Sequence, residues 1–528
     1  MSHITSNPDE MVGKAEKSSW EASLPLEGVY PAVPTQQAED MSSHPDNPRN
    51  WPIWKKNVQI LMVAFHSMVA TFMAAGIIPA FDSMAEEYGV TVPEASYLTS
   101  IQILVLGLTP FLWKPITCIY GRYHVSLVSV LGSLACNIGG ARCTTYGAQM
   151  ATRVLTAILI SPPIGIGSGV ITELCEPEER AQKLGWWTLM TTLGTPAGPF
   201  IMGFVAKHIG FEWIYWIYVM INFAQFLAYL LLGEETMYVA GDAGDGKGGP
   251  TSKFIPRRID PRPLKPREFI ESIFLYRYPR ILIPTIAQCV VFCYANTAII
   301  VEMPIAFGQK FHFDAQQIGL QYIAVIIGSL IGEQVSGPMS DWFMKALSKR
   351  RGYFRPADRL WLSYIGFATV IAGLLTWGFQ LDNATSWNVT PCVGAAIASF
   401  GNQILTTILI SFAVDCYKDQ STDIGVFVNF VRHVYGFIGP FYFPPMFKTL
   451  NLGGAAGVMC AIIGKSMTDG FNELYGNTMY ELALIHLSKA QTEGRTSQMY
   501  KDACLEGKPV SIVGKMSNVK RFLIQFTG

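Results

Sequence analysis

The sequence predicts an all-α membrane protein whose helices form two bundles of six. The first observation is composition: 50% of the 528 residues are hydrophobic and 15% are charged, too apolar a balance for a soluble globular protein. The second is that apolar runs of about 20 residues, enough to cross a bilayer, recur along the chain. The third is a hydrophilic stretch at residues 233–279, which divides these runs into two sets.

The spans are expected in two groups on either side of this stretch. The first bundle, residues 57–232, is expected to hold spans at 57–81, 95–118, 123–141, 148–172, 184–206 and 213–232. The second bundle, residues 280–464, is expected to hold spans at 280–305, 317–337, 360–379, 389–415 and 424–447. Residues 1–56 are polar, lack the apolar core of a signal peptide and predict a disordered cytosolic tail. Residues 233–279 predict a cytosolic linker.

The twelfth span is left undecided by the sequence. Only 14 residues, from Asn451 to Gly464, precede Lys465, and as a helix they would extend about 21 Å at 1.5 Å per residue. One interpretation is a shortened span followed by an atypical tail at 465–528. The other is a helix that continues through Lys465 to about Tyr475.

Basic residues orient the chain, because Lys and Arg accumulate on the cytoplasmic side of membrane proteins. They are frequent in the N-terminal segment, in the linker and in the connection between spans eight and nine, which places the N-terminus inside. The two N-x-Ser/Thr sequons of the chain, at Asn383 and Asn388, fall in the loop between spans nine and ten, on the opposite side. Both asparagines are therefore candidate glycosylation sites.

Several function classes have no support in the sequence. Lys plus Arg and Asp plus Glu number 39 each, and no basic segment interleaved with aromatics predicts nucleic-acid binding. The cysteines form no CxxC pair and the histidines occur singly, so we expect no metal site, no disulfide framework and no enzymatic constellation. Residues 241–247 have the spacing of a phosphate-binding loop, but Gly248 stands where the magnesium-binding Ser or Thr belongs. We therefore expect no nucleotide or other cofactor, and transport driven by an ion gradient.

Span five carries the most distinctive pattern. Gly194, Gly198 and Gly203 occur with Pro199 inside one apolar run. Gly costs about 1 kcal/mol and Pro about 3 kcal/mol in a helix interior, but membrane helices tolerate both where they pack closely on a neighbour or bend. The pattern predicts a close-packed, kinked helix; the alternative to a role in transport is that the small residues only permit packing.

Short motifs after spans two and eight indicate an internal repeat. The first reads Tyr-Gly121-Arg122 and the second reads Gly337-Pro-Met-Ser-Asp341. Each resembles part of the Gly-x-x-x-Asp-Arg-x-Gly-Arg signature of the major facilitator superfamily. Both copies depart from the signature. In the first, Lys114 replaces the first Gly, Cys118 replaces the Asp and Ile119 replaces the Arg. In the second, Trp342 replaces the Arg and Met344 replaces the second Gly. In the family that Asp joins a cytosolic charge network, so its replacement leaves open how the first half is latched.

The span-five pattern resembles the exporter signature of that superfamily, and Arg153 resembles the buried arginine of its span four, with Ala157 where Gly is usual. Other fragments resemble the fungal drug:proton antiporter branch, namely Glu235-Thr236, Gly337-Pro-Met-Ser-Asp341, Arg355-Pro-Ala-Asp-Arg359-Leu360 and Asp415-Cys416-Tyr417. Over residues 50–447 the resemblance implies a rocking pair of six-helix bundles in the plasma or vacuolar membrane. It also implies proton-coupled export of an amphipathic small molecule, such as a secondary metabolite, toxin or xenobiotic, by a monomer. The alternatives are proton-coupled uptake of a small cation such as a polyamine, and a non-transporting sensor.

Polar groups inside the spans are candidates for binding protons or substrate, because a charge at the bilayer centre costs about 2.5–3.5 kcal/mol or more. His66, Glu333 and Glu302 could titrate, whereas Arg153 and Arg432 are fixed cations. Neutral hydrogen-bonding groups could contact substrate or simply join helices. The further candidates are Asn296, Asn402, Asn429, His433, Gln288 and Gln403.

Overall fold

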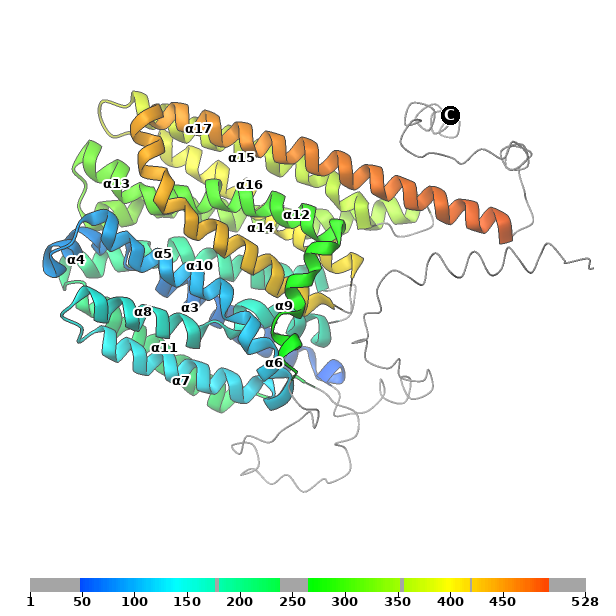
Figure 1. Ribbon diagram of the computed structural model, residues 1–528, viewed down its shortest axis with the longest axis horizontal. Helices are drawn as coiled ribbons and strands as arrows, with labels where there is room; N and C mark the ends of the chain where they lie inside the picture. The colour runs from blue at the N-terminus through cyan, green and yellow to red at the C-terminus, as the bar shows by residue number, and fades with distance from the viewer. Residues whose placement is uncertain (1–47, 176–179, 238–264, 352–355, 418–419, 493–528) are drawn as a thin grey trace, which may run out of the picture.

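The computed structural model describes residues 48–175, 180–237, 265–351, 356–417 and 420–492, and within these ranges it contains helices and no strand. The helices run roughly along one direction (Figure 1). In the described ranges, nine are long and apolar enough to cross a membrane, or ten if one bent pair is counted as a span. The predicted all-α membrane fold is confirmed.

The first half contains a helix or a pair of helices at each of the six expected positions. They are, in order, α3 (Ile53–Ala75) with η2 (Ile78–Ala80) and α4 (Phe81–Tyr88); α5 (Val92–Leu108) with α6 (Pro110–Tyr120); α7 (Arg122–Gly140); α8 (Tyr146–Ile160) with α9 (Pro162–Leu174); α10 (Arg180–His208); and α11 (Glu212–Leu232). The chain is ordered before residue 57: η1 (Pro48–Asn50) precedes α3, and Arg49 Nε donates a hydrogen bond to the carbonyl of Glu173, 3.1 Å away. Residues 48–56, which the sequence assigns to the tail, are therefore ordered, and residues 1–47 lie outside the described ranges.

The second half repeats the arrangement. Its helices are α12 (Pro279–Phe292) with the π-helical turn η6 (Cys293–Ala298) and α13 (Ile299–Phe311); α14 (Ala315–Arg351); α15 (Leu360–Asn383), preceded by η7 (Pro356–Arg359); α16 (Thr390–Cys416); and α17 (Ser421–Thr492). From the linker, the described part contains η4 (Pro266–Phe269) and η5 (Glu271–Arg277), and η5 packs against α12 and α17. The phosphate-loop-like residues 241–247 lie outside the described ranges.

Several spans that the sequence predicts as continuous are broken. Span two bends by 43° between α5 and α6, where Pro110 begins the second helix, and span four is interrupted at Ser161 before Pro162. Proline has no N–H to continue the helical hydrogen bonds and restricts the residue before it. Span seven contains the π-helical turn η6, a distortion that is frequent at functional sites.

The last helix corrects the expectation of a short twelfth span. Asn451, with φ 55° and ψ 172°, breaks α17 into two helices, and the second continues without a break past Lys465 to Thr492. The helix thus continues through Lys465, as one of the two interpretations expected, but it ends at Thr492 and not near Tyr475. Residues 465–492 contain no proline and many good helix formers, so the helix can extend beyond the hydrocarbon.

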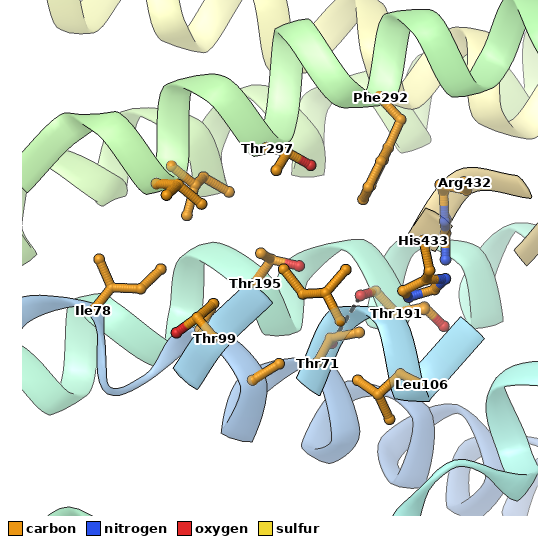
Figure 2. Close-up of a pocket in the computed structure, with 15 residues that line it drawn as sticks. Thr71, Ile78, Thr99, Leu106, Thr191, Thr195, Phe292, Thr297, Arg432 and His433 are labelled. Atoms are coloured by element: carbon orange, nitrogen blue, oxygen red, sulfur yellow. Dashed lines mark hydrogen bonds between the residues drawn. The ribbon is translucent and has the colours of Figure 1, made fainter. Parts of the chain in front are cut away.

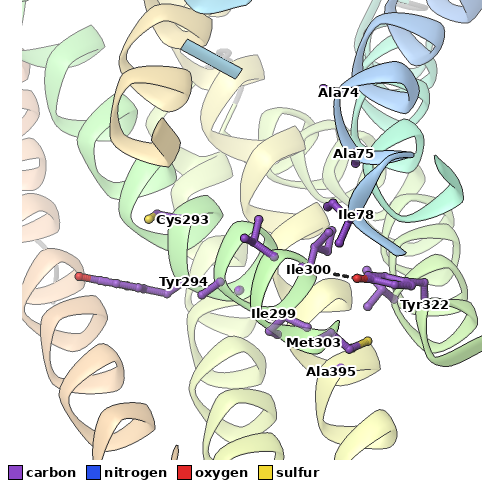
Figure 3. Close-up of a cluster of buried hydrophobic side chains, with 14 of the residues drawn as sticks. Ala74, Ala75, Ile78, Cys293, Tyr294, Ile299, Ile300, Met303, Tyr322 and Ala395 are labelled. Atoms are coloured by element: carbon purple, nitrogen blue, oxygen red, sulfur yellow. Dashed lines mark hydrogen bonds between the residues drawn. The ribbon is translucent and has the colours of Figure 1, made fainter. Parts of the chain in front are cut away.

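The main core joins the two halves. Its buried apolar side chains include Ala74 and Ile78 from the first half and Ile300 and Met303 from the second (Figure 3). Within it the Tyr322 hydroxyl donates a hydrogen bond to the carbonyl of Ile300, 2.7 Å away. The halves therefore meet along a continuous apolar surface in the middle of the molecule.

Candidate substrate cavity and the contacts that close it

Helix α10 contacts α3 at backbone distance, which explains its glycines. A Cβ on Gly198 would lie 2.6 Å from the carbonyl oxygen of Phe72, and one on Gly194 would lie 2.9 Å from the Phe72 nitrogen. The Thr71 hydroxyl donates to the carbonyl of Thr191 across the same contact, at 2.9 Å. Close approach of this kind is how small residues stabilise helix pairs in membranes. Packing thus accounts for Gly194 and Gly198, and their role in transport stays a prediction.

The other end of the span-five pattern contacts the opposite half. A Cβ on Gly203 would lie 2.6 Å from the carbonyl oxygen of Ala315, and one on Gly319 would lie 3.0 Å from the carbonyl oxygen of Pro199. Helix α10 remains helical through Pro199. Gly194 and Gly198 therefore pack α10 against α3 within the first half, and Pro199 and Gly203 pack it against α14 of the second.

Polar contacts accompany Gly203 at this end, which we call the outer contact. Lys207 Nζ lies 3.3 Å from Asp314 Oδ2, and His208 Nε2 is hydrogen-bonded to Gln316 Oε1 at 3.0 Å. The backbone N–H of Gln317 donates to the Asp314 carboxylate, and together with Lys207 it lowers the pKa of that group. The outer contact is therefore closed in this structure.

The opposite end is closed by α9 and α17, and we call this the inner contact. A Cβ on Gly169 would collide with the Thr422 hydroxyl, and the Ser168 hydroxyl donates to the carbonyl of Ser421, 3.1 Å away. One turn further in, Asn429 Nδ2 donates to the carbonyl of Ile164 at 2.7 Å. The candidate Asn429 thus joins the two halves through a backbone carbonyl.

Lys114 supplies an ion pair at the inner contact. Its ammonium pairs with the Asp423 carboxylate in the first turn of α17, and the Ser272 hydroxyl of η5 also donates to that carboxylate. The residue that departs from the family signature in the first half therefore carries a charge across to the second half.

The remaining signature residues form matching charge clusters, one in each half. Arg122 makes a bidentate pair with Glu173, both N···O distances being 2.6 Å. Arg359 lies 2.9 Å from Asp415 and 3.3 Å from Asp341. Each cluster ties the start of a helix to the end of the fourth or tenth span, so the predicted repeat is visible in the structure.

The two signature glycines differ in their surroundings. Gly121 has φ 80°, a conformation that side-chain-bearing residues rarely adopt, and it directly precedes α7. A Cβ on Gly337 would meet only Glu333 Oε1, at 3.6 Å. Gly121 is therefore required by the backbone, whereas Gly337 has room for a side chain.

A small cavity of about 30 Å³ lies between the inner and outer contacts. At about 10–15 Å³ each it has room for two water molecules, so a larger ligand requires the halves to part. Figure 2 shows threonine side chains from both halves around the cavity, with Arg432 and His433 lying near each other at one side of it. The lining residues are Thr71, Ala74, Ala75, Ile78, Thr99, Ile103, Leu106, Thr191, Thr195, Phe292, Thr297, Ile300, Val301, Arg432 and His433.

Of the polar residues that the sequence offers as proton or substrate candidates, two line the cavity, Arg432 and its neighbour His433. The threonines of the lining were not predicted. A hydroxyl in an apolar span is a weak signal, because threonine often bonds to its own helix, as Thr71 does with the carbonyl of Met68 at 3.0 Å.

His66 is fully buried inside the first bundle. Its Nδ1 is hydrogen-bonded to the Tyr229 hydroxyl at 3.1 Å and its Nε2 to the Ser129 hydroxyl at 3.3 Å. These contacts join α3 to α7 and α11. They support the interpretation of a histidine that links helices, and they place it away from the cavity lining.

Glu333 lies on α14 where it faces α10. Its Oε2 accepts hydrogen bonds from Gln403 Nε2 at 2.8 Å and from the Thr407 hydroxyl at 2.6 Å, and a Cβ on Gly185 would collide with Oε1. The residue is 4% exposed, and the ion pairs of the described residues include no cation bound to it. It is a buried carboxyl at the boundary between the halves.

The other candidates are buried outside the cavity. Arg153 donates to the carbonyl of Ala74 at 3.0 Å, while its Nε and Nη1 have no acceptor among the described residues. The side-chain amides of Asn296 and Asn402 likewise have no hydrogen-bond partner there. None of the three is brought into contact with Arg432 by the structure.

The two sequon asparagines lie at the connection between α15 and α16. Both are exposed, Asn383 at the end of α15 and Asn388 before α16. Their modification stays a prediction.

Comparison with known proteins agrees with this architecture. The family model of the Major Facilitator Superfamily matches residues 63–440. The efflux pump vrtL of Penicillium aethiopicum is 26% identical over 450 residues, covering 80% of this chain and 85% of the pump. The probable efflux pump mfs2 of Aspergillus flavus is 24% identical over 393 residues, covering 71% and 91%.

A solved structure shares the fold. The crystal structure of the human organic anion transporter MFSD10 superposes with a TM-score of 0.60 at 13% identity. The match covers 79% of this chain and 99% of that one. Family and fold indicate a transporter rather than an enzyme. This chain therefore belongs to the major facilitator superfamily and is a multi-pass membrane transporter related to fungal efflux pumps.

Proposed function

We propose that this protein exports an amphipathic small molecule in exchange for protons, with Glu333 as the proton-binding group. Several relatives are named efflux pumps, which supports export. The observation that carries the proton coupling is the buried Glu333 carboxyl between α14 and α10. Secondary metabolites or xenobiotics are the expected cargo, and a monomer in the plasma membrane is the expected form.

The surroundings of Glu333 suggest how a proton would be coupled to opening. An ionised carboxylate at membrane depth costs about 2.5–3.5 kcal/mol or more, and the groups that face it, Gln403 and Thr407 of α16 and Gly185 of α10, are neutral. Binding a proton removes that charge while the halves are closed. When α10 and α14 part, water reaches the carboxyl and it can release the proton.

The alternatives receive less support. A polyamine carrier needs an acidic cavity, whereas none of the lining residues is acidic and Arg432 is among them. A non-transporting sensor would bind ligands without exchanging them. Counterflow in proteoliposomes distinguishes a sensor from a carrier, because only a carrier exchanges labelled for unlabelled ligand.

The test is proton-coupled flux in inverted membrane vesicles that carry an imposed pH gradient. The probes are 1-naphthaleneacetate, 1-naphthaleneacetamide and 2-(1-naphthyl)ethylamine. Wild-type protein should dissipate the gradient when a transported probe is added. Glu333→Gln should lose this dissipation but keep counterflow of the same probe.

Glu302→Gln is the matched variant, because Glu302 is also a buried carboxyl of the second half but lies on α13. It should keep the coupling. Coupled flux in Glu333→Gln, or its loss in Glu302→Gln alone, would contradict the assignment of the proton to Glu333. Absence of counterflow with every probe in wild-type protein would contradict transport.

A further inference from the structure

Arg432 is a buried cation whose charge is not matched. It is 4% exposed, and its Nη2 donates to the side-chain oxygen of Asn429 at 2.6 Å. Its guanidinium carbon lies 4.7 Å from the centroid of the Phe292 ring. Its Nε has no acceptor among the described residues. The guanidinium is therefore stabilised by the neutral side-chain amide of Asn429 and by the face of the Phe292 ring.

No acidic residue among those lining the cavity compensates Arg432. Its neighbour His433 is oriented by a hydrogen bond between Nδ1 and the carbonyl of Asn429, at 2.6 Å. The other polar lining groups are threonine hydroxyls, such as Thr191 and Thr195 of the first half and Thr297 of the second. A cation at membrane depth is costly unless it is paired, so this cavity favours an anionic guest.

The guanidinium is suited to a planar anion. Its N–H groups form a fork that binds a carboxylate with two parallel hydrogen bonds, and it keeps its charge under physiological conditions. Ile78, Leu106 and Ile300 supply apolar surface on the rest of the lining. Charge, hydroxyl groups and apolar surface together describe a site for a molecule with an acidic head and an apolar body.

We propose that the substrates of this transporter are amphipathic carboxylates, held through their carboxylate by Arg432. The inference rests on the proposed export function and names its substrate class. When the halves part, the apolar body lies in the enlarged cavity between Phe292 and the threonine-bearing helices. A cationic amphiphile of the same size is repelled from the site.

The experiment measures binding to the full-length protein in nanodiscs, by the shift in its unfolding temperature. The probes are the naphthyl carboxylate, amide and amine named above, which share one ring system and differ in head-group charge. Wild-type protein should be stabilised by the carboxylate more than by the amide, and not by the amine. Arg432→Gln should weaken carboxylate binding at least tenfold, a factor that corresponds to about 1.4 kcal/mol, and should leave amide binding within about twofold.

Two variants separate a specific contact from a general effect of charge. Arg432→Lys keeps the charge but loses the fork, and should retain part of the preference for the carboxylate. Lys448→Gln removes the same charge from an exposed position on the same helix, and should behave as wild type. If Arg432→Gln does not fold, the test is the ratio of carboxylate to amide affinity in Arg432→Lys, which should be lower than the ratio in wild-type protein.

Three results would overturn the proposal: equal carboxylate affinity in Arg432→Gln and wild type, preference of the wild type for the amine, and no stabilisation of the wild type by the carboxylate. The failure of proton-coupled export is seen separately. Wild-type protein that binds the carboxylate but does not dissipate a pH gradient would disprove the coupling and leave the substrate class standing.

Discussion

Breaking the Lys114–Asp423 ion pair should shift the protein toward the state that is open at the inner end. The pair joins α6 of the first half to the first turn of α17 in the second, and its side chains are 13% and 20% exposed. Lys114→Gln leaves the Asp423 carboxylate with the Ser272 hydroxyl as its remaining donor. Because the pair exists only while the inner contact is closed, its loss should destabilise that state.

The magnitude follows from the partial burial of the pair. Two unit charges about 4 Å apart interact by about 4 kcal/mol at an effective dielectric constant near 20. Desolvation and side-chain ordering offset much of this, and fully exposed pairs retain about 0.2–1 kcal/mol. For a pair that is mostly buried we expect about 1–2 kcal/mol, which is roughly a 5- to 30-fold change in the ratio of closed to inner-open protein.

The assay is the distribution of distances between spin labels on the inner ends of α9 and α17, measured in nanodiscs. The charge exchange Lys114→Asp with Asp423→Lys should restore the closed population. Lys55→Gln is the control: Lys55 pairs with Glu234 at 23% and 33% exposure, but this pair does not reach the second half. An unchanged distribution in Lys114→Gln, or an equal shift in Lys55→Gln, would refute the reasoning.

Two further predictions concern the outer contact and use labels on the outer ends of α10 and α14. Gly203→Ala places a methyl group 2.6 Å from the Ala315 carbonyl oxygen, and overpacking of this kind costs about 1–3 kcal/mol. The outer-open population should therefore rise in Gly203→Ala. Gly457→Ala is the control and should have no effect, because a Cβ on Gly457 would meet open space. An unchanged population in Gly203→Ala would contradict the tight fit. Acidification should also open this contact, because the Gln317 N–H and Lys207 lower the pKa of Asp314. The ionised Asp314 carboxylate stabilises the closed contact fully above the ordinary aspartate pKa of about 3.9. This stabilisation is lost as the pH falls through the lowered pKa. In a His208→Gln background, which removes the nearby imidazole, Asp314→Asn should abolish this low-pH step, and a step that persists would assign it to another group.

The sequence by itself determined the class of the protein and the position of its spans. A membrane helix satisfies its own backbone hydrogen bonds, so an apolar run of sufficient length specifies it locally. The same local reasoning identified α10 as a helix packed against its neighbours, since three glycines inside one helix are costly unless they allow close packing. It did not determine the length of the last helix, because residues beyond Lys465 are polar and hydropathy does not report on helices outside the membrane.

Only the tertiary structure decided which polar residues belong together. Arg432 and His66 look alike in sequence as single ionisable groups in apolar spans, but the rotation of each helix directs Arg432 into the cavity and His66 into the first bundle. The partners Lys114 and Asp423 are separated by 309 residues. Contacts across that separation depend on how the two halves dock, and the local pattern of hydrophobicity carries no information about that docking.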